Sequence, residues 1–177
     1  MDDSYLNLLR RVPKQIVSSP RVQLKELNRG YRLNLDAESA PTPALPESHR
    51  FRLFFRQSID LSELFSVGLE WLRPPASDLY LMLNRYNGAH GRHTNTHTDG
   101  QIFVRCFHRH VGLVRFLDHP SIAFEHHAEP ATYADYGGAV RQFFQDIGVL
   151  NGTSFLTVLG IPATGAGHQG TLFDGYH

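Results

Sequence analysis

The chain has 177 residues, of which 41% are hydrophobic and 19% charged, and its seventeen basic residues balance seventeen acidic ones. This composition excludes a disordered chain and fits one globular domain with a sizeable core. The balanced charge gives no overall attraction to nucleic acid or membrane, although a local basic patch is compatible with it. Cys106 is the only cysteine, which excludes a disulfide framework and a cysteine-based zinc site.

The sequence contains neither a signal peptide nor an apolar run approaching the roughly 20 residues that cross a bilayer. We therefore expect a cytoplasmic protein with no membrane partner. The basic residues are unevenly chosen, since only Lys14 and Lys25 are lysines and the other fifteen are arginines. Genomic codon bias explains this choice, and so does a preference for bidentate contacts to phosphate or carboxylate.

Hydrophobic periodicity in the first half predicts one helix and then strands. Apolar residues at helical spacing over 5–12 predict a short N-terminal helix, capped by Asp2, Asp3 or Ser4. Alternating residues then predict a hairpin over 22–35, with its turn at 28–30. Three prolines predict a loop over 37–48. Further strands are predicted over 51–56, 64–72 and 79–83.

The second half predicts a strand over 102–110, another over 113–117, and one long helix. That helix covers 133–147, and Gly148 is placed to end it. An edge strand is expected over 155–161 and a flexible tail over 162–177. Many strands with helices only at the ends predict a single α+β domain over 1–161. Its expected architecture is one antiparallel sheet, with a short N-terminal and a C-terminal helix packed on one face.

Histidines are concentrated in one segment of the chain. Eight of the eleven lie between Asn87 and His127, with arginines among them. Histidine changes charge near neutral pH and is also the commonest metal ligand, so we expect the chemistry of the protein here. We interpret His119 as a turn residue and His126 and His127 as surface residues. The remaining candidates are His90, His93, His108 and His110.

The turn chosen for this segment decides whether these histidines form one site. If Asp99-Gly100 is a two-residue hairpin turn, Gly91 faces His108 and His93 faces Cys106. One face then carries His93, Asn95, His97, His108 and His110, and the other carries Arg92 and Arg109. If 88–100 is instead one long loop, the histidines divide into two groups. The sequence leaves both arrangements open.

Two metal-binding motifs are partly matched by the histidines. His108-x-His110 begins like the cupin motif, but Val114 and Arg115 stand where its glutamate belongs. His97-x-Asp99 matches the ligand pair of non-haem iron oxygenases, whose distal histidine would have to be His168. A tight turn at Asp99-Gly100 explains Asp99 without a metal. A transition-metal protein stays an alternative, with His93, His97, His108 and His110 as ligands.

The residues around the histidines favour an anionic substrate. Asp99 is the only carboxylate between Asn87 and Arg115, which disfavours magnesium or calcium. A histidine pair can move protons while arginine neutralises charge on phosphoryl oxygens. These residue types suit metal-independent cleavage of RNA, with no cofactor. The predicted catalytic residues are His90, His93, His108, His110, Arg92 and Arg109.

Four short motifs, Asn87-Gly88-x-His90, His93-Thr94-Asn95, Asp99-Gly100 and His108-x-His110, resemble a functionally uncharacterised family of small bacterial domains. More distantly they resemble the TumE-like toxins of toxin–antitoxin pairs, which also carry a histidine-rich hairpin. The resemblance implies a bacterial toxin or phage-defence ribonuclease, with RNA as substrate and a cognate antitoxin as partner. A non-catalytic interaction module, using the sheet edge or the proline-rich loop, is the third hypothesis.

Overall fold

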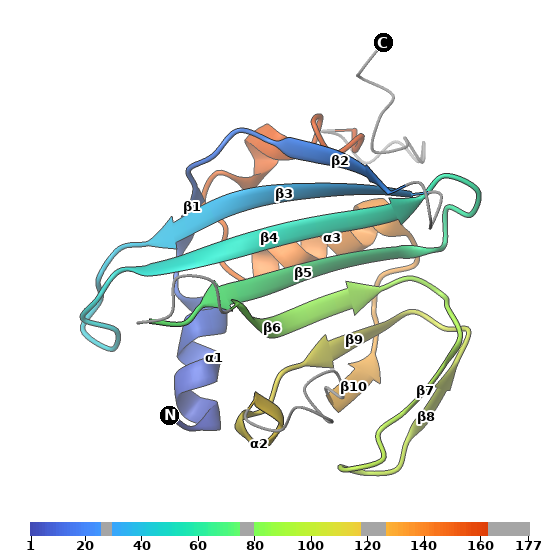
Figure 1. Ribbon diagram of the computed structural model, residues 1–177, viewed down its shortest axis with the longest axis horizontal. Helices are drawn as coiled ribbons and strands as arrows, with labels where there is room; N and C mark the ends of the chain where they lie inside the picture. Colours follow the sequence, from blue (N-terminus) through green and yellow to red (C-terminus); the bar gives the residue numbers. More distant parts are fainter. Residues whose placement is uncertain (26–29, 75–79, 118–126, 163–177) are drawn as a thin grey trace.

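A computed structural model describes residues 1–25, 30–74, 80–117 and 127–162, and within them confirms an α+β fold (Figure 1). The main sheet is antiparallel and eight-stranded, in the order β1-β3-β4-β5-β6-β9-β10, with β2 beside β1 on β3. Its strands are β1 (Lys14–Ile16), β2 (Arg21–Lys25), β3 (Gly30–Ser39), β4 (His49–Ser58), β5 (Phe65–Leu72), β6 (Tyr80–Asn87), β9 (His108–Val111) and β10 (His127–Pro130). A separate two-stranded sheet pairs β7 (Arg92–Thr94) with β8 (Ile102–Val104).

Two helices, α1 (Asp3–Arg11) and α3 (Tyr136–Asp146), cover one face of the main sheet. Figure 1 looks onto the other face, with α3 visible behind β4 and β5. α1 starts at one of its expected caps, because the Asp2 carboxylate accepts a hydrogen bond from the amide of Tyr5. α3 starts three residues later than expected, at a cap that the sequence analysis did not name: the Asp135 carboxylate accepts a hydrogen bond from the amide of Gly138. None of the described helices has the length and apolar character needed to cross a membrane.

The core lies between the helices and the sheet. Leu6 and Leu9 of α1 are fully buried there. Phe143 and Phe144 of α3 both make edge contacts with Phe55 of β4, at ring separations of 6.1 and 5.9 Å. The core therefore occupies one face of the sheet, and none of the described helices covers the opposite face, which we call the open face.

A bulge in β6 changes which residues of this strand face the core. Its pairing with β5 shifts by one residue beside Leu69 and Glu70. Before the shift Leu81 points to the core, and after it Tyr86 does so. Arg85 therefore lies on the open face, opposite Gly68.

Several expectations about element boundaries were wrong. β3 continues to Ser39 because it pairs with β1 and β4, so the proline-rich loop is shorter than 37–48. Arg105 has a φ of 45°, which separates β8 from β9 where one strand over 102–110 was expected. Residues 114–117 form the short helix α2 (Val114–Leu117) rather than a strand.

The strand expected over 155–161 is also absent. A 3₁₀ helix (Gly152–Phe155) and tight turns occupy this region, because Leu156, Leu159 and Ile161 contact the core from a coiled backbone. The strands β1 and β10 were not predicted. The tail expected at 162–177 lies outside the described residues except for Pro162, and so do His119 and His126.

Lys14 joins the ends of α1 and α3 beneath the sheet. Its side chain is fully buried, and its ammonium group donates to the carbonyls of Arg10, Val12 and Ile147 at 2.8–3.0 Å. These carbonyls lie at the C-terminal ends of the two helices, where partial negative charge favours a cation. Burial nevertheless lowers the pKa of Lys14 to about 7.

The stability of the protein should therefore rise with pH above 7. Folded Lys14 loses its proton near pH 7, whereas a lysine in the unfolded chain keeps its proton up to about pH 10.4. Between these values the unfolded state binds more protons, so raising the pH favours the folded state, by up to about 1.4 kcal/mol per unit. Urea unfolding at pH 7, 8 and 9 measures this slope. A Lys14→Met variant with the same slope as the wild type would contradict the assignment.

Candidate functional site

Four of the predicted histidines lie together at one end of the open face. The rings of His90 and His108 are 5.1 Å apart between centres, and those of His93 and His110 are 4.4 Å apart. His108 links the two pairs, at 6.0 Å from His93 and 4.9 Å from His110. The sequence left open whether these histidines form one group or two, and the structure brings His90, His93, His108 and His110 into one group.

Neither the hairpin with its turn at Asp99-Gly100 nor the long loop over 88–100 describes how this group forms. β7 pairs with β8 so that His93 lies opposite Phe103, and residues 95–101 form the turn. The Asp99 carboxylate accepts the amide of Gln101 within that turn. His108 reaches the site because β9 pairs directly with β6, opposite Asn87. The β7–β8 hairpin and the direct pairing of β9 with β6 therefore act together to bring the histidines into one cluster.

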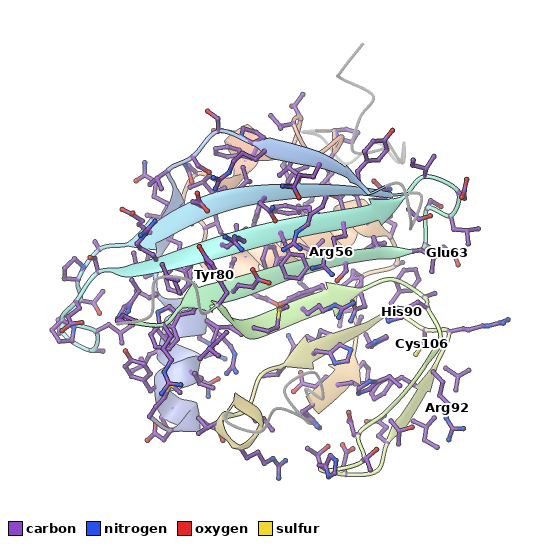
Figure 2. All side chains as sticks on the ribbon, in the orientation of Figure 1. Arg56, Glu63, Tyr80, His90, Arg92 and Cys106 are labelled. Atoms are coloured by element: carbon purple, nitrogen blue, oxygen red, sulfur yellow. The ribbon has the colours of Figure 1, made fainter. Side chains whose placement is uncertain are left out.

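His90 and His108 are anchored in the same way. In each ring Nδ1 lies against the backbone carbonyl two residues earlier, Gly88 for His90 at 2.9 Å and Cys106 for His108 at 2.8 Å. The carbonyl accepts a hydrogen bond, so Nδ1 carries the proton in both rings and Nε2 is the basic atom of the neutral form. The two reactive nitrogens are thus fixed by backbone, and Figure 2 shows His90 and Cys106 beside each other where the hairpin leaves the sheet.

The hairpin that carries His93 is attached through Asn95. The side-chain amide of Asn95 donates to the carbonyl of Ala128 and accepts from its N–H, both at 2.8 Å. Asn95 thereby pairs with β10 much as another strand would. Because its Oδ1 also lies 3.3 Å from Nε2 of His93, the same amide orients the His93 ring. Asn95 is a positioning residue, and it is 3% exposed.

Apolar and amide groups complete the site. Phe103 is buried against His108 at a ring separation of 5.7 Å, outside the main core. Asn87 is fully buried, and its Nδ2 lies 3.5 Å from Nε2 of His108. Its Oδ1 is buried and has no hydrogen-bond partner among the described residues, which leaves an unpaired acceptor beside His108.

His108 is held in its neutral form. Burial lowers its pKa below the usual histidine value, since the ring is 1% exposed. The hydrogen bond to Cys106 opposes this shift, whereas the neighbouring His90, His93 and Arg85 add to it by repelling a further positive charge. A neutral imidazole at neutral pH is able to accept a proton.

The two predicted arginines lie elsewhere. Arg109 points to the helical face, where its guanidinium pairs with Glu129 at 2.6 Å and Asp146 at 3.4 Å. Tyr86 donates to the same Asp146 carboxylate at 2.6 Å. Arg92 is exposed on the outer side of the hairpin (Figure 2). Neither arginine joins the histidines, and Arg109 instead ties β9 and β10 to α3.

The residues of the metal hypothesis are only partly together. His93, His108 and His110 are in ring contact, whereas His97 lies in the turn at the tip of the hairpin. His168 lies outside the described residues. Among the residues that the structure describes, no three histidine, cysteine, aspartate or glutamate side chains are placed to hold a metal ion.

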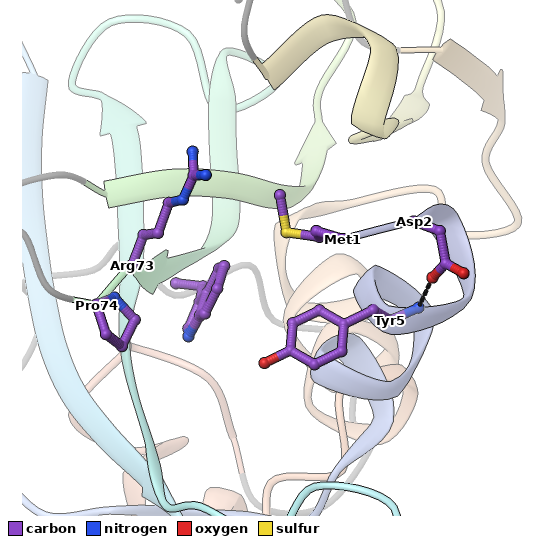
Figure 3. A pocket seen from close by; sticks show the side chains of 6 residues that line it. Met1, Asp2, Tyr5, Arg73 and Pro74 are labelled. Carbon is purple, nitrogen blue, oxygen red and sulfur yellow. Dashed lines mark hydrogen bonds between the residues drawn. The ribbon is translucent and has the colours of Figure 1, made fainter.

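A pocket of about 500 Å³ lies far from the histidines, at the start of α1 (Figure 3). Tyr5 and Arg73 stand on two of its sides, and Trp71 and Pro74 also line it. Trp71 pairs with Leu81, at the opposite end of the β5–β6 ladder from Asn87. The Asp2 carboxylate in this pocket is occupied as the cap of α1. We therefore place the candidate site at the histidines.

Sequence reasoning missed the supporting residues rather than the histidines. Phe103 gives no signal of its own, since a phenylalanine in a strand is ordinary, and Asn95 shares the predicted histidine face only in a hairpin register that does not form. Arg85 and Asn87 follow the apolar part of the strand predicted over 79–83, and that pattern fits a place in the site as well as a solvent-exposed strand end. The bulge in β6, which no pattern announced, puts both of them on the open face.

Comparisons with protein family models, with curated proteins and with solved structures found no match to this chain. The resemblance to histidine-hairpin domains and TumE-like toxins therefore stays a hypothesis.

Removing the Asn95 amide should release the hairpin. Asn95→Ala leaves the buried N–H and C=O of Ala128 without their partner, which should cost about 2 kcal/mol of unfolding free energy. Urea unfolding measures this loss. Hydrogen exchange at the Ala128 amide should accelerate, and the nuclear Overhauser contacts between the His93 and His110 rings should weaken.

Asn151→Ala is the matched control. The Asn151 amide makes the same two hydrogen bonds to the backbone of Ile16, at 2.9 and 3.0 Å, on the other side of the sheet. Asn151→Ala should lower the free energy of unfolding by a similar amount but leave the contacts between the histidine rings unchanged. Intact His93–His110 contacts in Asn95→Ala would show that another interaction holds the hairpin.

Proposed function

We propose that the histidine cluster is a general acid–base centre that cleaves RNA without a metal ion. The observation that supports this most directly is the pair His90 and His108, anchored alike through Nδ1 and 5.1 Å apart between ring centres. Two neighbouring imidazoles with fixed tautomers are what proton transfer to and from one substrate requires.

In the proposed reaction His108 is the base and His90 the acid. Nε2 of neutral His108 takes the proton of a ribose 2′-hydroxyl, and the 2′-oxygen attacks the adjacent phosphorus. The bond from phosphorus to the 5′-oxygen breaks while protonated His90 gives its Nε2 proton to that oxygen. The products are a 2′,3′-cyclic phosphate and a 5′-hydroxyl, so no oxidant, metal or external nucleophile is needed.

The other residues of the site have supporting roles in this proposal. The buried Oδ1 of Asn87 accepts a hydrogen bond from the ribose, and the nearby Arg85 neutralises charge on the phosphoryl oxygens. The resemblance to toxins suggests that such cleavage would restrain growth, in toxin–antitoxin or phage-defence fashion, with an antitoxin as partner.

Substituting the base should abolish cleavage. His108→Gln should lower the cleavage rate of a single-stranded RNA by about 100-fold or more, because glutamine cannot accept the proton. His49→Gln is the matched control, since His49 is another buried histidine that contacts Trp71 far from the site. Equal rates in the wild type and in folded His108→Gln protein would refute the mechanism.

The pH profile provides a separate test of the role of His108. Because its pKa is lowered, the rise of kcat/KM with pH should have its midpoint below 6.5. Arg85→Gln removes a positive charge that lowers this pKa, so the midpoint should move to higher pH. A pH-rate profile of both proteins measures the shift. A midpoint that stays in place would mean that another group is the base.

Metal analysis of protein purified without a histidine tag distinguishes the second hypothesis. Full activity after chelation, with no stoichiometric metal, supports the acid–base mechanism. Stoichiometric zinc, iron or nickel whose removal abolishes activity would instead assign the cluster to a transition metal. Harmless expression together with no cleavage of any RNA would favour a non-catalytic interaction module.

A further inference from the structure

The open face of the sheet continues from the histidines across four neighbouring strands. In the antiparallel register, residues opposite each other form rows that cross β9, β6, β5, β4 and β3. One row contains His108, Asn87, Ser66, Arg56 and Arg32, and the next contains His110, Arg85, Gly68, Phe54 and Asn34. With neighbouring strands about 4.8 Å apart, the rows extend for about 19 Å.

Three arginines in these rows are held in place by the sheet. The Phe54 ring lies over Gly68, where an added Cβ would stand 2.3 Å from the ring. The guanidinium groups of Arg56 and Arg32 cover that ring, at 4.7 and 5.5 Å from its centre. Nε of Arg85 donates to the Ser66 hydroxyl at 2.7 Å. Arg32 and Arg56 belong to the first of the two rows and Arg85 to the second, and we call these three residues together the arginine row.

The arginine row carries positive charge that its surroundings compensate only weakly. Burial lowers the pKa of Arg85 to about 10, and the neighbouring Arg56 adds to this effect. Burial also lowers the pKa of Arg56, with Arg32 contributing. No ion pair joins the three guanidinium groups to a carboxylate within the described part of the chain, and Glu70, the acidic group that acts on Arg56, lies 3.8 Å from Arg52.

We propose that the arginine row binds the backbone of single-stranded RNA and leads it to the histidine cluster. Arginine binds phosphate through two parallel hydrogen bonds, and the half-buried cations gain the counter-charge that the protein does not supply. Arg85 lies opposite His110 of the cluster, and Arg56 and Arg32 lie two and three strands beyond Arg85 on the same face. Figure 2 shows Arg56 and His90 in one view of this face. This inference rests on the proposed function, because RNA is named as the anion.

Binding of a 2′-O-methyl RNA oligonucleotide tests the row, because that probe lacks the nucleophile and cannot be cleaved. Fluorescence anisotropy over a range of salt concentrations measures affinity and its salt dependence. Arg56→Gln should weaken binding about tenfold and reduce the slope of log affinity against log salt by about 0.7. Arg56→Lys keeps the charge and should keep the slope, which separates lost charge from altered folding.

Arg50→Gln is the matched control, on the same strand and with the same change of charge. Arg50 is exposed and lies 3.9 Å from Glu38, beyond the row. It should leave affinity and slope unchanged. Equal losses in Arg50→Gln and Arg56→Gln, or no measurable binding at low salt, would overturn the proposal. Inorganic polyphosphate that binds more tightly than RNA at equal charge would also overturn it, by naming another polyanion.

Cleavage of a dinucleotide separates the row from the proposed reaction, because so short a substrate reaches the histidines without reaching Arg56. If the dinucleotide is cleaved but Arg56→Gln does not change oligonucleotide binding, the proposed role of the arginine row is wrong and the proposed acid–base centre is supported. If Arg56 governs binding but neither substrate is cleaved, the reaction is wrong and the RNA-binding row stands.

Discussion

The main sheet has strands whose outer backbone groups need partners, and two asparagine side chains provide them at β1 and β10. A side-chain amide presents an N–H donor beside a C=O acceptor, as the N–H and C=O of one residue in an extended strand do, so it pairs with an edge strand without extending the sheet. Asn151 does this for Ile16, and Asn95 does it for Ala128. At β10 the same contact attaches the hairpin that carries His93. Closing the edge and assembling the histidine cluster are therefore one structural event.

Arg109 on the helical face and the arginines near the histidines on the open face differ in how their charge is compensated. On the helical face, Arg109 meets Glu129 and Asp146, so its charge is matched within the protein. On the open face, Arg56 and Arg85 rest on an aromatic ring and a hydroxyl group instead of carboxylates. A matched cation strengthens the fold, whereas an unmatched and rigidly held cation is available to a ligand. The unmatched arginines are the ones that the proposed RNA chemistry uses, whereas Arg52, farther along the open face, has Glu70 at 3.8 Å.

The sequence predicted elements whose period is strong and local, and it failed where distant partners decide. Helix α3, which ends just before Gly148, and the alternating side chains of β4 follow from neighbouring residues alone. β10, which contains Pro130, becomes a strand only because β9 offers it a partner. Arg105 breaks the strand expected over 102–110 by adopting a positive φ that no pattern favours. The histidines were found by residue type, but their register, and the roles of Asn95 and Arg85, depended on pairings between strands.

The bulge in β6 has a consequence for how this protein tolerates change in length. Within one strand, Leu81 and Leu83 serve the core in one phase of the alternation, and Tyr86 serves it in the other. Deleting the extra residue would leave the pairing on both sides of it in register, so the alternation would become uniform while Tyr86 stays in the core and Arg85 and Asn87 stay on the open face. A second insertion in this stretch would instead shift every following residue by one and exchange the two faces. We therefore expect a deletion at the bulge to be tolerated better than an insertion there, whereas the turn at 95–101 has no such restriction.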